Sequence, residues 1–132
     1  MARTRAAGLE IEYETFGRKS DPAVLLIMGY AAQMTMWPVS FCQGLASRGF
    51  RVIRFDNRDA GLSSHLSHLG VPNVAEAMIK GLAGQKVNAP YSLEDMAADS
   101  VGLLDALEIP TAHIIGASMG GMVAQIIAIK LE

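Results

Sequence analysis

Short runs of apolar residues recur along the chain and predict strands. Residues 9–13 alternate apolar and polar positions, which is typical of a strand with one exposed face. Residues 23–28 are apolar without interruption, as in a strand buried on both faces. Residues 51–55 have the pattern of a further strand, and the short run at 113–115 predicts another one just before a glycine-rich turn.

Helices are predicted between these strands. Pro38 fits the first turn of a helix that ends near Gly49. Ser92 and Asp95 match the S-x-x-D pattern that starts many helices. Residues 119–131 predict a further apolar helix. The helix that Ser92 opens carries an apolar stripe at helical spacing, made of Leu93, Met96, Ala97, Ser100, Val101, Leu104 and Leu107.

Strands and helices therefore alternate, which predicts an α/β fold with a mostly parallel sheet and flanking helices. In such sheets, ligands bind beside the carboxyl ends of the strands. Three loops fall at those ends: the one after Gly29, the one after Asp56, and residues 116–120. Between the last two, residues 74–82 predict a short helix with Asn73 as its N-cap.

Composition and charge argue against some classes of protein function. Hydrophobic residues make up 51% of the 132 residues and charged residues 18%, which suits one compact globular domain. The net charge of -2 comes without any Lys/Arg cluster, so we expect no nucleic-acid partner. The basic start of the chain lacks the apolar stretch of a signal peptide, and no apolar run is long enough to span a bilayer. We therefore expect no membrane association.

The cysteine and histidine content bears on location and metals. Cys42 is the only cysteine, so an internal disulfide is excluded. With no export signal, a cytoplasmic location is expected. The three histidines lack the spacing of a metal site, so we expect no metal.

Residues 116–120 form the pattern G-x-S-x-G, with a strand-like run before it and an apolar helix after it. In this context the serine occupies a sharp strand-to-helix turn and its Oγ projects beyond the sheet. Gly116 and Gly120 leave room for strand and helix to pass closely. This favours Ser118 as the nucleophile of such an elbow over an incidental serine in a glycine-rich turn. A dinucleotide fingerprint fits poorly, because its middle glycine would fall at Ser118.

A serine nucleophile also needs backbone donors for the oxyanion. The N–H of Met119, the residue after the nucleophile, is one expected donor. The Gly29–Tyr30 turn follows the strand at 23–28 and is expected to supply the other. Gly29 lets the backbone turn sharply and approach a substrate oxygen. The alternative is a glycine that only ends the strand.

Four blocks of sequence follow one another in order: residues 26–30 with Gln33, Met34, Trp37 and Pro38, then 54–64, 91–99 and 116–122. Together they resemble the α/β-hydrolases, in the branch that includes aclacinomycin methylesterase and related bacterial hydrolases. The resemblance covers nearly the whole chain. It implies that residues 1–132 are a single incomplete α/β-hydrolase core, the N-terminal half of the fold, ending just after the elbow helix.

The resemblance implies a serine hydrolase that acts on small-molecule carboxylic esters by acyl transfer, without a cofactor. Ser118 matches the nucleophile of the family, and Met119 with the Gly29–Tyr30 turn matches its oxyanion donors. Many relatives have His-Gly at the start of that turn. This chain has Met28 before the glycine, which leaves the backbone role intact.

The loop over residues 56–63 resembles a supporting turn near the site. Its glycine and Asx residues are those that turn geometry requires. We therefore do not expect Asp56 or Asp59 to be catalytic.

The triad of this family follows the chain order Ser, then Asp or Glu, then His. The residues after Ser118 contain no histidine, and their only acid is Glu132. His113 starts the strand that leads to the serine and so lies at the wrong end of the sheet. His65 and His68 are expected to be solvated loop residues. We therefore expect a fragment that lacks the triad Asp and His and is inactive alone.

Two alternatives stay open. The same fold also hosts perhydrolases and lactonases. The chain could instead be a non-catalytic assembly module, because a half-sheet leaves an edge strand and an apolar face uncovered. Such a surface would form a homo-oligomer, bind a complementing C-terminal segment or aggregate. The intact elbow argues against a purely structural role, since a strained serine turn has no purpose in a scaffold.

Overall fold

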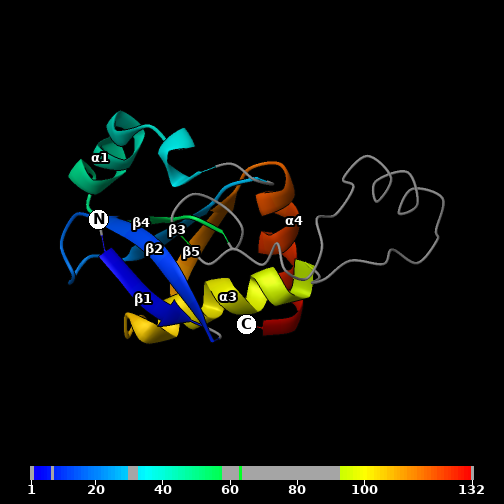
Figure 1. The fold of residues 1–132 in the computed structure, drawn as a ribbon. Helices are drawn as coiled ribbons and strands as arrows, with labels where there is room; N and C mark the ends of the chain where they lie inside the picture. The colour runs from blue at the N-terminus through cyan, green and yellow to red at the C-terminus, as the bar shows by residue number, and fades with distance from the viewer. Residues whose placement is uncertain (1, 7, 30–32, 58–62, 64–92, 132) are drawn as a thin grey trace.

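The computed structural model describes residues 2–6, 8–29, 33–57, 63 and 93–131. Their helices and strands form a layered α/β structure around one sheet (Figure 1). In chain order the elements are β1 (Ala2–Ala6), β2 (Leu9–Phe16), β3 (Ala23–Ile27), η1 (Met34–Met36), α1 (Val39–Ser47), β4 (Arg51–Phe55), α3 (Leu93–Ala106), β5 (Ala112–Gly116), α4 (Met119–Ile126) and η3 (Ile127–Leu131).

The described strands form one five-stranded sheet in the order β1-β2-β4-β3-β5. Strands β3, β4 and β5 run parallel, with Leu25 in register between Ile53 and Ile114. Strand β2 is antiparallel to both β1 and β4, so the sheet is mixed. The predicted α/β class is confirmed, and the predicted parallel arrangement applies to the three strands that lead to the candidate loops.

Strand β1 has no counterpart among the predicted strands. Its sequence, ARTRA, shows no apolar periodicity that would mark a strand. Its partner determines it instead, because all five residues pair with β2. Arg3 also reaches across to β2, with its guanidinium 3.1 Å from the Glu12 carboxylate and 3.4 Å from that of Glu10.

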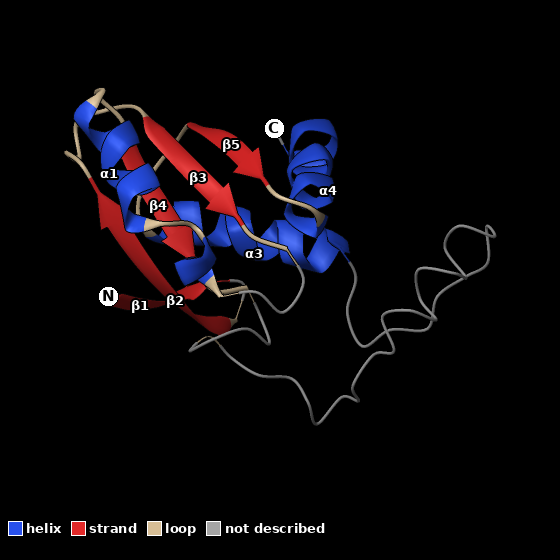
Figure 2. Cartoon of the chain, turned by 90° about the horizontal axis from the view of Figure 1, so that it is seen from above, coloured by secondary structure: helices blue, strands red, loops and turns tan. Residues whose placement is uncertain are grey.

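The helices cover both faces of the sheet, with α1 on one side and α3 and α4 on the other (Figure 2). On the α1 side, Val24 and Leu26 pack with Val52 and Cys42. The opposite face carries the larger core, which includes Ile11, Leu25, Ile27, Ile53, Phe55, Met96, Leu103 and Val123. Successive residues of β3 thus alternate between two cores, which explains its unbroken apolar run.

The predicted helices that fall within the described residues are present, with differences in detail. Pro38 is the N-cap of α1 and precedes its first turn. Residues 119–131 are helical, first as α4 and then with the wider π-helical spacing of η3. In α3, Leu103 is fully buried although the predicted stripe omits it. Ser92 and the helix predicted over 74–82 lie outside the described residues.

Candidate active site

Ser118 occupies the turn between β5 and α4, beyond the carboxyl end of the strand. Its backbone has φ 55° and ψ -120°. A residue with a Cβ rarely adopts a positive φ, and such a conformation costs on the order of 1–3 kcal/mol. The residue is exposed. The turn therefore holds an accessible serine in a strained conformation at the end of the sheet.

The elbow packs directly on the end of β3, and its two glycines make this possible. A Cβ on Gly116 would collide with the carbonyl oxygen of Gly120. A Cβ on Gly120 would collide with the carbonyl oxygen of Ile27 and lie 2.9 Å from that of Met28. The N–H of Ala117 donates to the carbonyl oxygen of Ile27 over 2.9 Å. Neither glycine position has room for a side chain.

Gly29 follows β3 and lies against Ser118. A Cβ built on Gly29 would be 3.2 Å from Ser118 Cβ and 3.7 Å from Ser118 Oγ. Met119 is the first residue of α4, so its N–H belongs to the first turn, whose donors lack an intrahelical acceptor. Two backbone segments from different elements therefore adjoin the serine. Tyr30, which is predicted to act with Gly29, lies outside the described residues.

Two residues directly after β4 make contacts that the sequence analysis does not foresee. The carboxylate Oδ1 of Asp56 accepts a hydrogen bond from the N–H of Met34 over 2.7 Å. The Nδ2 of Asn57 donates to the carbonyl oxygen of Met28 over 2.9 Å. Both side chains are buried. In the sequence, the feature that could have indicated these contacts is a pair of polar residues directly after an apolar strand. Asp59 lies outside the described residues.

A partly buried ion pair joins β4 to β2 just before these residues. Arg54 Nη2 is 2.8 Å from Glu14 Oε1, and Arg54 Nη1 donates to the carbonyl oxygen of Trp37 over 2.7 Å. The guanidinium lies over the Phe16 ring, 5.3 Å from its centroid. Arg54 thereby ties the segment that enters α1 to strands β2 and β4.

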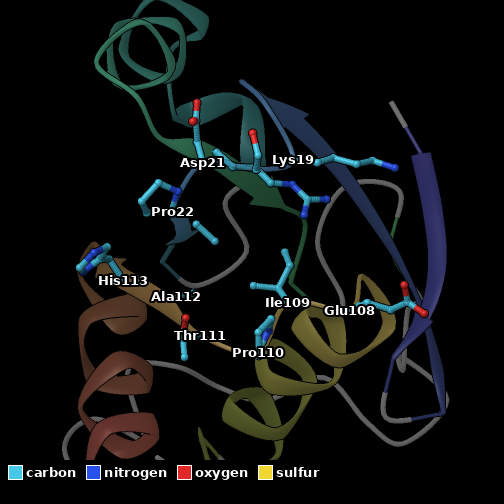
Figure 3. Close-up of a pocket in the computed structure, with 12 residues that line it drawn as sticks. Lys19, Asp21, Pro22, Glu108, Ile109, Pro110, Thr111, Ala112 and His113 are labelled. Atoms are coloured by element: carbon cyan, nitrogen blue, oxygen red, sulfur yellow. The ribbon is translucent and has the colours of Figure 1, made fainter.

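His113 lies near the start of β5, at the opposite end of the strand from Ser118. Its ring is edge-on to that of Phe50, with the centroids 6.2 Å apart. It lines a hollow of about 460 Å³ where the parallel strands begin (Figure 3). This position does not allow it to take the serine proton. His65 and His68 lie outside the described residues.

Within the described ranges, no cluster of three or more His, Cys, Asp or Glu side chains is arranged to hold a metal ion. None of the helices in these ranges has the length and apolar character needed to cross a membrane.

Comparison with known proteins identifies one family. A family model described as alpha/beta hydrolase fold matches residues 22–131. Rhodomycin D methylesterase DauP of Streptomyces sp. (strain C5) is 31% identical over 116 residues, which cover 88% of this chain and 33% of that protein. The 3-oxoadipate enol-lactonase 2 of Acinetobacter baylyi is 29% identical over 126 residues, which cover 94% of this chain and 38% of that protein.

Solved structures agree with these sequence matches. The enol-lactonase from Burkholderia xenovorans LB400 superposes with a TM-score of 0.73 and 25% identity, over 98% of this chain and 42% of that one. This chain spans only 33% and 38% of the lengths of the two curated relatives described above. The match over residues 22–131 and the shared fold establish that the chain belongs to the α/β-hydrolase family.

Proposed function

We propose that the chain carries the nucleophile and the oxyanion-binding turn of a serine hydrolase that acts on carboxylic esters. The supporting observation is the close approach of Gly29 to Ser118. Acyl transfer requires an accessible nucleophile with backbone donors held beside it before the substrate arrives. A strained, exposed serine against a glycine turn supports this proposal.

In the proposed mechanism, Ser118 Oγ forms a bond to the ester carbonyl carbon while its proton passes to a base. The carbonyl oxygen becomes an oxyanion, which accepts hydrogen bonds from the N–H groups of Met119 and the Gly29–Tyr30 turn. The ester C–O bond then breaks, and the alcohol leaves with a proton from the base. Water hydrolyses the acyl-serine in a second round and returns the free hydroxyl.

The relatives favour esters as the substrate class. One is named as a methylesterase and two as enol-lactonases, and a lactone is a cyclic ester. The same nucleophile and oxyanion donors serve open and cyclic esters, because both reactions pass through a tetrahedral oxyanion. We propose an ester or lactone substrate and leave the acyl and alcohol groups unassigned.

We further propose that the 132 residues turn over slowly by themselves. No histidine follows Ser118 in this sequence, and His113 lies at the opposite end of β5. A serine hydroxyl is a weak nucleophile without a neighbouring base. Attack and release should therefore both be slow. With an ester of a good leaving group, attack should be faster than release, so the acyl-serine should accumulate.

The test is incubation of the 132-residue protein with p-nitrophenyl acetate, followed by intact-mass measurement and peptide mapping. We expect one acetyl group to accumulate on Ser118, at a rate that keeps rising with pH because hydroxide, and not a histidine, would take the serine proton. Ser118→Ala should remove this acetyl group. Ser40→Ala, which changes an exposed serine of α1, should retain it.

Two results would contradict this proposal in different ways. Acetylation confined to lysines, or equal in Ser118→Ala, would show that Ser118 is not the nucleophile. Fast turnover with a rate that levels off near the ordinary histidine pKa, about 6.5, would show that a histidine serves the serine after all.

An assembly role is the second candidate, and the exposure of β5 favours it. Within the described residues β5 pairs only with β3, and Ile115 on β5 is 39% exposed. Met122 and Ile129, on the following helical segments, are also exposed. Light scattering over a range of concentrations tests this role. Concentration-dependent dimers would support it, and a monomer at every concentration would exclude it.

A further inference from the structure

The loop that carries Gly29 leaves the sheet beside the residues that follow β4. Strands β3 and β4 are parallel neighbours, with Leu26 in register with Arg54. Their carboxyl ends therefore lie side by side. This arrangement places Asp56 and Asn57, the two residues after β4, next to the loop that begins after β3.

Asp56 and Asn57 hold the two ends of this loop. The Nδ2 of Asn57 donates to the carbonyl oxygen of Met28, the residue before Gly29. The carboxylate of Asp56 accepts the N–H of Met34, the first residue of η1. The two side chains are only 3% and 4% exposed, so water competes little for either bond.

The bond from Asn57 also fixes the direction of one backbone donor. A trans peptide directs its C=O and N–H to opposite sides, and no cis peptide occurs among the described residues. The carbonyl of Met28 and the N–H of Gly29 belong to the same peptide unit. When Asn57 holds the carbonyl, the N–H of Gly29 must therefore point away from Asn57.

The backbone of Asp56 is itself hydrogen-bonded, to β2 and to Ser63. The N–H of Asp56 donates to the carbonyl oxygen of Glu12 on β2 over 3.0 Å. The Oγ of Ser63 donates to the carbonyl oxygen of Asp56 over 2.6 Å and accepts the N–H of Glu12 over 2.9 Å. Asp56 thus has fixed backbone contacts to the sheet, while its side chain reaches the loop.

We infer that Asp56 and Asn57 are positioning residues that set the Gly29 turn against Ser118 for oxyanion binding. This inference rests on the proposed function, because it assigns the pair to the oxyanion donors of that site. In this role neither residue needs to touch the substrate. Each acts through the backbone of the loop, and the energy gained is that of donors already aligned when the charge develops.

The test compares two probes that phosphonylate serine, a fluorophosphonate with P=O and its analogue with P=S. In both reactions a bond forms from Ser118 Oγ to phosphorus, the P–F bond breaks, and the serine proton goes to the buffer. Sulfur accepts hydrogen bonds poorly, so the ratio of the two rates reports how well the oxyanion donors are aligned. A general loss of folded protein lowers both rates equally and leaves the ratio unchanged.

Asn57→Asp is the main variant, because it keeps the shape but replaces the N–H donor with an acceptor facing the Met28 carbonyl. We expect the P=O rate to fall by up to about 100-fold, as for a misplaced catalytic group, and the rate ratio to fall with it. Asn57→Leu removes the donor without adding charge. It replaces Asn57→Asp in the test if that variant does not fold. Asp56→Asn retains an oxygen that accepts the Met34 N–H and should keep most of the ratio.

Ser100→Ala is the matched control, since Ser100 is also buried and hydrogen-bonded but lies on α3. It should change stability without changing the rate ratio. An unchanged ratio in both Asn57 variants, with a reactive wild-type Ser118, would overturn the positioning role and leave the proposed function standing. A wild type that gains no adduct at Ser118 would overturn both.

Discussion

Ser118 combines an accessible side chain with a backbone conformation that costs energy. Its φ is 55°, and the elbow around it is packed so closely at Gly116 and Gly120 that neither position has room for a Cβ. The cost arises from the Cβ, so the Ser118→Ala variant has the same conformational cost. Glycine has no Cβ and adopts this region freely. The two substitutions therefore separate the strain of the elbow from the loss of the hydroxyl.

We expect Ser118→Gly to be more stable than Ser118→Ala. The relief of strain should exceed the extra chain entropy that glycine gains on unfolding, leaving a net difference of about 1 kcal/mol. Urea denaturation of the two variants measures this difference in the free energy of unfolding. Equal stability, or a less stable glycine variant, would show that the elbow is not strained.

Gly29→Ala should weaken reactivity at Ser118 more than it weakens the fold. The new methyl group would sit 3.2 Å from Ser118 Cβ, so the turn must move by a few tenths of an ångström. We expect acylation by p-nitrophenyl acetate to slow by about 10-fold or more, because the oxyanion donors shift with the turn.

The control for Gly29→Ala is Gly44→Ala. Gly44 lies in α1, and a Cβ there would meet no atom within 4 Å. This change should raise the free energy of unfolding by about 0.5–1 kcal/mol through helix propensity and leave acylation unchanged. If the two variants acylate at the same rate, Gly29 has no part in the site.

Cys42 should be unreactive in the native protein. Burial raises the pKa of its thiol above the ordinary value. The folded state thus favours the neutral thiol, and this contribution to stability is complete below about pH 8.5 and is lost as pH rises through the raised pKa. We expect iodoacetamide to modify Cys42 in urea and to spare it under native conditions. Native alkylation at the rate of a free thiol would contradict this.

At the residue scale, the sequence predicts what a local pattern encodes. Ser118, Gly116 and Gly120 fall within five consecutive residues, so their spacing alone suggests an elbow. Asp56 and Asn57 also appear in the sequence, but only as turn formers. Their partners, Met34 and Met28, lie 22 and 29 positions away, at the start of η1 and in the segment between β3 and η1. Only the pairing of β3 with β4 brings them together, and no local pattern contains it.

At the scale of elements, the connection from α3 to β5 turns through Glu108. This residue has φ 59°, a left-handed conformation that is usually adopted by a glycine after a helix. The N–H of Ile109 donates to the carbonyl oxygen of Leu104 over 2.9 Å, which closes the end of α3. A side chain with a Cβ therefore occupies a position that favours glycine.

Glu108→Gly should stabilise the protein. Removing the Cβ relieves a conformation that costs roughly 1–2 kcal/mol, part of which the extra chain entropy of glycine offsets. We expect the free energy of unfolding to rise by about 0.5–1 kcal/mol, measured by urea denaturation. Glu108→Ala keeps the strain and should not show this gain. A gain of the same size in the alanine variant would point to the lost charge and not to the backbone.

The strands show how far patterns predict elements. The run at 23–28 predicts β3 because each of its faces packs against a core and both must be apolar. β1 was not predicted because it has no apolar pattern. Its pairing with β2 and the contacts of Arg3 stabilise it instead. β2 was predicted as a strand at residues 9–13, but its antiparallel direction was not, because the local apolar pattern is the same in either direction.

At the scale of the molecule, parallel pairing creates the candidate site. Gly29, Asp56 and Ser118 are far apart in the sequence, yet each follows the carboxyl end of one of three adjacent strands. The alternation of strands and helices was sufficient to predict that these loops meet. It could not predict which backbone group contacts which side chain, because that depends on strand register.

Intact-mass spectrometry with peptide mapping after treatment with a fluorophosphonate tests directly whether Ser118 is the nucleophile. It is carried out on the wild type, Ser118→Ala and Ser40→Ala. If Ser118 is the nucleophile of the elbow, the wild type and Ser40→Ala should gain one adduct on Ser118, and Ser118→Ala should gain none. No adduct on the wild type, an adduct on another residue, or an equal gain in Ser118→Ala would contradict this role of Ser118.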